Sequence, residues 1–119
     1  MASPTFLRLP IDASEGFPQG FRLVLGGRTY QFRLHANVAE ELPLTRPLDL
    51  PTDRAFLVLS VSREEPTGPV AVLRRKLVPG LVYHAGELAL LFRSMRLDPR
   101  NLNGVGSFGS EVVGGVALR

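Results

Sequence analysis

The stretch "FRLVLGGRTYQFRLH", Phe21 to His35, decides the fold class, because it reads as a complete β-hairpin. Apolar residues fall at positions 21, 23 and 25 and at positions 30, 32 and 34, on either side of Gly26-Gly27, and the two glycines supply the positive φ angles of a two-residue primed turn. The pairs predicted by this turn are Leu25–Arg28, Leu23–Tyr30 and Phe21–Phe32. Both apolar sets then lie on one face of the hairpin, while Arg22, Gln31 and Arg33 lie on the other.

The segments on either side of this hairpin also read mainly as strands. Strands are predicted over residues 6–10, 55–62, 70–78 and 111–119, from their alternation and their β-branched residues. Residues 87–96 have a different period, because Leu88, Leu91, Phe92 and Met95 follow the i, i+3, i+4, i+7 rule, which predicts one short helix. The expected fold is one mainly β domain over residues 1–119, a small antiparallel β-barrel or sandwich of about six strands with that helix at about residues 87–96.

Composition and charge exclude more functions than they indicate. The chain has 119 residues and no cysteine, which excludes disulfides and thiolate metal sites. Its net charge of +3 is too modest an excess to indicate nucleic-acid binding by itself. The N-terminal stretch lacks the pattern of a signal peptide, and no apolar run reaches the roughly 18 residues of a membrane helix. We therefore expect synthesis in a cytoplasm and no membrane partner.

A glycine-rich C-terminal segment at about residues 101–115 contains a literal G-x-G-x-x-G at Gly104, Gly106 and Gly109. The dinucleotide fingerprint needs a strand before the glycines and a helix after them. Here a predicted helix precedes the motif and a predicted strand follows it. Only ten residues remain after Gly109, so a βαβ unit cannot be completed. Nucleotide binding is not expected.

No other pattern indicates catalysis. The only histidines, His35 and His84, do not have the spacing of a metal-ligand pair. Glu64 and Glu65 are adjacent within a predicted turn and point different ways, which does not suit an acid/base couple. The serines lie outside any G-x-S-x-G context. The chain is expected to be no enzyme and to have no catalytic, cofactor or metal site.

A leucine- and proline-rich insert occupies about residues 38–53. Prolines 43, 47 and 51 argue against regular structure there. Its leucines, which are Leu42, Leu44, Leu48 and Leu50, leave two alternatives open. The insert either packs on its own domain or is an arm that packs on a neighbouring chain.

The one basic cluster is Arg74, Arg75 and Lys76. Beside Arg22, Arg28 and Arg33 it could form a basic sheet face, as in β-barrels that bind single-stranded nucleic acid through cations and stacking aromatics. The hairpin aromatics, however, are predicted on the face opposite the arginines. A solvated or partner-facing cluster is therefore the preferred interpretation.

The order and spacing of these motifs resemble one family, the small plug domain of contractile-tail phage baseplates, first defined in a cyanophage. The N-terminal "LRLPIDASEGFPQGF" resembles its leucine-and-proline strand and the polar stretch leading to a Phe. The first hairpin matches the family pattern at Phe21, Leu25, Gly27, Tyr30, Arg33, Leu34 and Asn37. The second, "AFLVLSVSREEPTGPVAVLRRKLVPG", closes with its l-V-x-G at Leu77, Val78 and Gly80, and "GELALLFRSM" matches an apolar segment ending near an aromatic, here Phe92.

This resemblance implies a structural protein of the virion, located in the tail baseplate or hub after synthesis in the host cytoplasm. It would help to close or organise the central tail channel, without catalysis or cofactor. Its partners would be hub, tail-tube or tape-measure proteins and copies of itself in a symmetric assembly. The candidate interface residues are Leu42, Leu44, Leu48, Leu50, Arg22, Arg33, Arg74, Arg75, Lys76 and Phe108. The alternative function is a small β-barrel that binds single-stranded nucleic acid.

Overall fold

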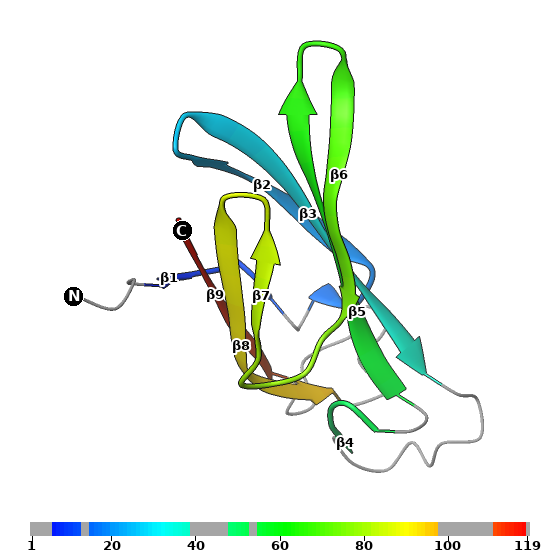
Figure 1. Ribbon diagram of the computed structural model, residues 1–119. Helices are drawn as coiled ribbons and strands as arrows, with labels where there is room; N and C mark the ends of the chain where they lie inside the picture. The colour runs from blue at the N-terminus through cyan, green and yellow to red at the C-terminus, as the bar shows by residue number, and fades with distance from the viewer. Residues whose placement is uncertain (1–5, 13–14, 39–47, 53–54, 98–110, 119) are drawn as a thin grey trace, which may run out of the picture.

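Two antiparallel β-sheets pack face to face in the computed structural model, which describes residues 6–12, 15–38, 48–52, 55–97 and 111–118 (Figure 1). The four-stranded sheet has the order β2 (Gln19–Leu25), β3 (Arg28–Val38), β5 (Ala55–Glu65) and β6 (Gly68–Lys76). In the five-stranded sheet, β1 (Leu7–Arg8) pairs with β9 (Glu111–Leu118), which pairs with β8 (Leu88–Leu97). Two short strands, β4 (Leu48–Asp49) and β7 (Val82–Ala85), pair with different ends of β8. The expected mainly β, antiparallel fold is confirmed, and it is a sandwich.

The hairpin of β2 and β3 has the predicted register. Leu25 pairs with Arg28, Leu23 with Tyr30 and Phe21 with Phe32. Gly26 and Gly27 have φ angles of 58° and 77°, as a primed turn requires. The apolar face points into the core, where Phe21 stacks on the buried Phe32 with ring centroids 5.1 Å apart. The opposite face is exposed at Arg22, Gln31 and Arg33, as expected.

The predicted helix over residues 87–96 is wrong, because this segment is strand β8. Its register against β9 shifts between Phe92 and Ser94, so Arg93 is the extra residue of a β-bulge. The large buried side chains are Leu88, Leu90 and Phe92 before the bulge, and Met95 and Leu97 after it. The bulge lengthens the step between buried residues from two to three positions. That single three-residue step imitates helical spacing in the sequence.

Regular structure also occurs where none was expected. Strand β3 continues to Val38, and β4 lies inside the proline-rich insert, where Leu48 pairs with Leu97. Strand β7 completes a tight hairpin with β8. The nine strands of the described residues therefore exceed the expected six.

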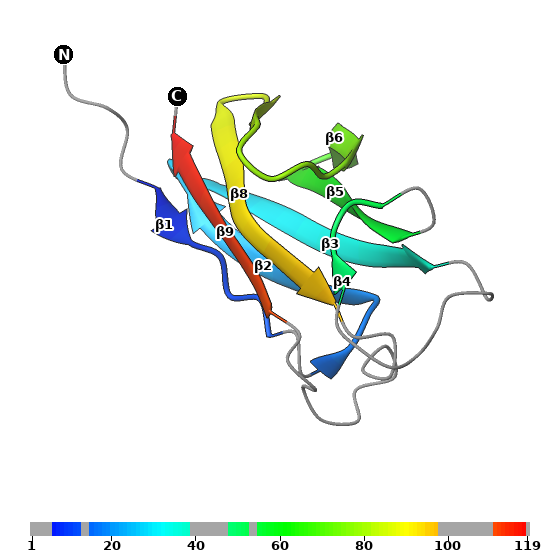
Figure 2. The same ribbon diagram turned by 90° about the horizontal axis from the view of Figure 1, so that it is seen from below.

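Strand β9 lies close to its neighbours because it carries two glycines. A Cβ atom at Gly114 would lie 2.6 Å from the ring of Phe92, which is fully buried in the core. A Cβ atom at Gly115 would lie 2.8 Å from Cβ of Phe6. Figure 2 shows the resulting layer of β1, β9 and β8 in front of β2 and β3. Buried residues of both sheets form one hydrophobic core.

Candidate functional site

The basic cluster Arg74, Arg75 and Lys76 lies at the end of β6, which is an edge strand because it pairs only with β5. All three side chains are exposed. Arg74 lies opposite Ser60, on the outer face of the sheet. Arg75 lies opposite the buried Leu59, on the face that turns toward the second sheet.

The outer face of the four-stranded sheet carries a cross-strand row of cations. Arg33 and Arg74 both lie opposite Ser60, one on each side of it, and Lys76 follows Arg74 on the same face. Lys76 also lies 4.8 Å above the ring centre of Phe56. The structure thus brings Arg33, Arg74 and Lys76 together, as the sequence suggested.

These cations differ in charge environment from Arg22, Arg28, Arg63 and Arg96, each of which forms an ion pair with a carboxylate. Arg22 is paired with Glu64 at 2.7 Å, so it belongs to a separate ion pair on the same face. Among the described residues, no carboxylate forms an ion pair with Arg33, Arg74, Arg75 or Lys76. The outer face beside the β6 edge is therefore positively charged and uncompensated within the described part of the chain.

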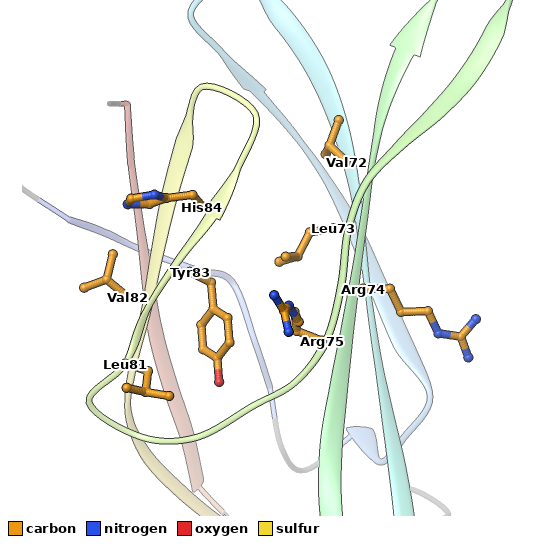
Figure 3. Close-up of a pocket in the computed structure, with 8 residues that line it drawn as sticks. All are labelled: Val72, Leu73, Arg74, Arg75, Leu81, Val82, Tyr83 and His84. Carbon is orange, nitrogen blue, oxygen red and sulfur yellow. The ribbon is translucent and has the colours of Figure 1, made fainter.

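A groove of about 600 Å³ separates the β6 edge from the β7 edge (Figure 3). Its lining residues are Val72, Leu73, Arg74, Arg75, Leu81, Val82, Tyr83 and His84. Figure 3 shows Leu73, Arg75 and Tyr83 pointing into the groove, while Arg74 points away from it. The groove exists because β6 and β7 belong to different sheets and diverge from the loop that joins them.

Near the loop that joins β6 and β7, one side chain connects the two edges of the groove. The Tyr83 hydroxyl accepts a hydrogen bond from the backbone N–H of Val78 at 2.8 Å and donates one to the carbonyl of Lys76 at 3.0 Å. The carbonyl of Lys76 therefore faces away from β5 and toward β7. Tyr83 thus links β7 to the residues at which β6 ends.

A second polar group connects the two sheets and was missed by the sequence reasoning. Glu87, in the turn between β7 and β8, accepts a hydrogen bond from the hydroxyl of the fully buried Tyr30. Its other carboxylate oxygen lies 3.3 Å from Arg63 of β5, which also pairs with Glu65. We call Tyr30, Arg63, Glu65 and Glu87 the polar cluster. In the sequence, Glu87 was assigned to a helix start, and nothing local indicated a contact 57 residues away.

The apolar interface candidates have different outcomes. Leu42, Leu44 and Phe108 lie outside the described residues. The backbone of Leu48 belongs to β4. Leu50 is only 4% exposed and belongs to the hydrophobic core, so at this position the insert packs on its own domain.

The histidines lie apart. His35 is half-buried on the outer face of β3, and its Nδ1 is buried without a hydrogen-bond partner in the described part of the chain. His84 is exposed on β7. Within the described ranges, no group of three or more His, Cys, Asp or Glu side chains could hold a metal ion. The same ranges contain no helix long and apolar enough to cross a membrane.

Comparisons with protein-family models, curated proteins and solved structures give no match for this chain. The resemblance to the baseplate plug family stays a prediction from sequence motifs. What the structure defines is a class of architecture, a small antiparallel β-sandwich with an open, positively charged strand edge.

Proposed function

We propose that this chain is a non-catalytic structural subunit of a contractile phage tail, in the baseplate or hub, and that it acts by packing against other proteins. The observation that supports a protein-binding role is the β6 edge. It combines an open groove with Arg74 and Lys76, which form no ion pair with any described carboxylate. Exposed cations at fixed positions on a strand favour specific pairing with carboxylates across a protein contact.

The tail assembly itself is inferred from the sequence motifs. In this proposal the chain helps to close or organise the central channel, beside hub, tail-tube or tape-measure proteins. Several copies would surround the channel symmetrically, as most homomeric assemblies are closed and symmetric. The cationic outer face and the β6 edge would then be covered by neighbours.

The experiment that tests this proposal is quantitative mass spectrometry of purified intact tail particles, with the chain counted against the sheath protein. We expect a fixed copy number far below that of the sheath. Absence of the chain from clean particles would overturn the proposal.

Single-stranded nucleic-acid binding remains the second candidate, because Arg33, Arg74 and Lys76 share one exposed sheet face. The aromatic residues Tyr30 and Phe32 are buried in the core and offer no stacking surface. Stacking would fall to Phe56, which already lies beneath Lys76. A filter-binding titration with oligothymidylate at increasing salt measures this activity, and a steep salt dependence would favour it.

A further inference from the structure

We propose that the β6 edge binds an extended segment of a partner protein by strand addition, and that this segment carries carboxylates at alternating positions, acidic–apolar–acidic. The inference rests on the proposed protein-binding role and adds the chemistry of the partner.

The backbone of β6 has hydrogen-bonding groups that point away from β5, and of these the carbonyl of Lys76 already accepts a hydrogen bond from the Tyr83 hydroxyl. The N–H of Leu77 donates to the carbonyl of Leu57 on β5 at 2.8 Å, so the backbone of Leu77 faces β5. Because backbone groups alternate in direction along a strand, those of Arg75 also face β5, and those of Arg74 and Lys76 face the open side. The direction of the Lys76 carbonyl toward Tyr83 agrees with this alternation. An added strand would exchange hydrogen bonds with the N–H and carbonyl of Arg74 and accept one from the N–H of Lys76, whose carbonyl is already bonded to Tyr83.

The side chains at the same two positions set the charge of the added strand. Arg74 and Lys76 both lie on the outer face, two residues apart, and neither has a carboxylate partner among the described residues. Residues directly opposite them in an added strand would also lie two apart on the outer face. Carboxylates at these positions would pair with both cations, whereas basic residues would be repelled.

The residue between the two carboxylates meets a different surface. Its side chain would lie on the groove side, facing Leu73, Arg75 and Tyr83 (Figure 3). An apolar or aromatic side chain suits this place, because it covers Leu73 and the aliphatic stem of Arg75. The predicted motif is therefore a carboxylate, an apolar or aromatic residue, and a second carboxylate.

A second copy of β6 is a poor occupant of the same edge. Antiparallel pairing of two β6 strands centred on Arg74 would place two Arg74 side chains directly opposite each other, and like charges in that position destabilise a sheet. Cationic residues on an edge strand are a known protection against such self-association. In this register the cations disfavour a second copy of β6, whereas the same cations favour an acidic strand.

The test is an NMR titration of the full chain with the capped peptide acetyl-TVEYEVT-amide. Its two glutamates flank one tyrosine, so that both carboxylates lie on one face of the extended peptide. We expect shifts of amide signals confined to β6 and the groove, and slower hydrogen exchange at the N–H groups of Arg74 and Lys76. The matched control is acetyl-TVYEEVT-amide, which has the same composition and charge but adjacent glutamates, and it should bind several-fold more weakly.

Charge-reversal variants distinguish binding by strand addition at β6 from nonspecific electrostatic attraction of the peptide. In the double variant Arg74→Glu with Lys76→Glu, binding of the glutamate peptide should fall about tenfold or more, since each opposite-charge pair contributes about a two- to fivefold effect. The same variant should gain binding of acetyl-TVKYKVT-amide. Arg8→Glu changes an exposed residue on β1, at the opposite edge of the other sheet, and should leave both affinities unchanged.

Three results would overturn the inference. The first is that no amide signal of β6 shifts at millimolar peptide, and the second is that the two isomeric peptides bind equally well. The third is that oligothymidylate shifts the same amide signals at lower concentration and in a salt-sensitive way, which would assign the edge to nucleic acid. A chain that is present in tail particles but binds none of the peptides keeps the proposed function and loses this inference. A chain that is absent from particles but binds the glutamate peptide at β6 loses the tail assignment alone.

Discussion

Removal of the Glu87 carboxylate should weaken the connection between the two sheets. Glu87 lies at the tip of the β7–β8 hairpin, yet its contacts, Tyr30 and Arg63, belong to the opposite sheet. In Glu87→Ala, the hydroxyl of the fully buried Tyr30 loses the acceptor that the structure shows for it. Arg63 keeps only its pair with Glu65.

The expected loss follows from these contacts. A hydrogen bond to a charged group contributes about 1.5–3 kcal/mol, and an unpaired buried hydroxyl costs about 1–3 kcal/mol. The additional ion pair of Glu87 with Arg28 is exposed at the arginine and adds at most about 1 kcal/mol. We therefore expect Glu87→Ala to lower the free energy of unfolding by about 2–4 kcal/mol. Tyr30→Phe leaves no orphaned hydroxyl and should cost about 1–2 kcal/mol.

The assay is urea denaturation of both single variants and the double variant, followed by circular dichroism. The two changes should not add, and their coupling energy should exceed about 1 kcal/mol. Glu64→Ala is the matched control, because the two recorded partners of Glu64 are both exposed: Arg22, whose side chain is 63% exposed, and Gln31. Glu64→Ala should lower the free energy of unfolding by less than about 1 kcal/mol. Additive effects of Tyr30→Phe and Glu87→Ala would refute the role of the polar cluster.

Three further outcomes are expected. Gly114→Ala should lower the free energy of unfolding by about 1–3 kcal/mol, because the new Cβ atom would lie 2.6 Å from the buried Phe92 ring. Thermal denaturation measures this loss, and an unchanged melting temperature would contradict the close packing of β9. Leu50→Ala should cost about 2–5 kcal/mol in the same assay, as for other buried leucines, and a neutral result would mean that this part of the insert does not belong to the core. Arg74→Glu should change the free energy of unfolding by no more than about 0.5 kcal/mol, since its side chain is exposed. Lys76→Glu also removes the contact with the Phe56 ring and should cost about 0.5–1 kcal/mol, and measuring both losses keeps a loss of binding from being confused with unfolding.

The sequence predicts the first hairpin correctly because all the information for it is local. Its register follows from a two-residue glycine turn and from apolar residues at alternate positions on both sides of it. Strand β8 is different, because one inserted residue, Arg93, breaks the alternation and produces a helical spacing. A bulge depends on the partner strand, so its position is not readable from β8 alone.

In the candidate site, too, some features follow from local sequence and others depend on how distant strands pair. The outward direction of Arg22 and Arg33 follows from the alternation of the hairpin and is confirmed by their exposure. That β6 is an edge strand, with a groove beside it, depends on which sheet β7 joins, and the sequence does not contain this pairing in any local pattern. The contact between Tyr30 and Glu87 depends on how the two sheets pack.

Hydrogen exchange at β6, measured in the free chain and in intact tail particles, tests the central claim most directly. The free chain should exchange the N–H groups of Arg74 and Lys76 rapidly, because they lie on an open edge. In assembled particles the same N–H groups should be strongly protected, while buried β8 positions such as Leu90 should change little. Equal exchange at Arg74 and Lys76 in both states would contradict the claim that this edge is where the chain joins its assembly.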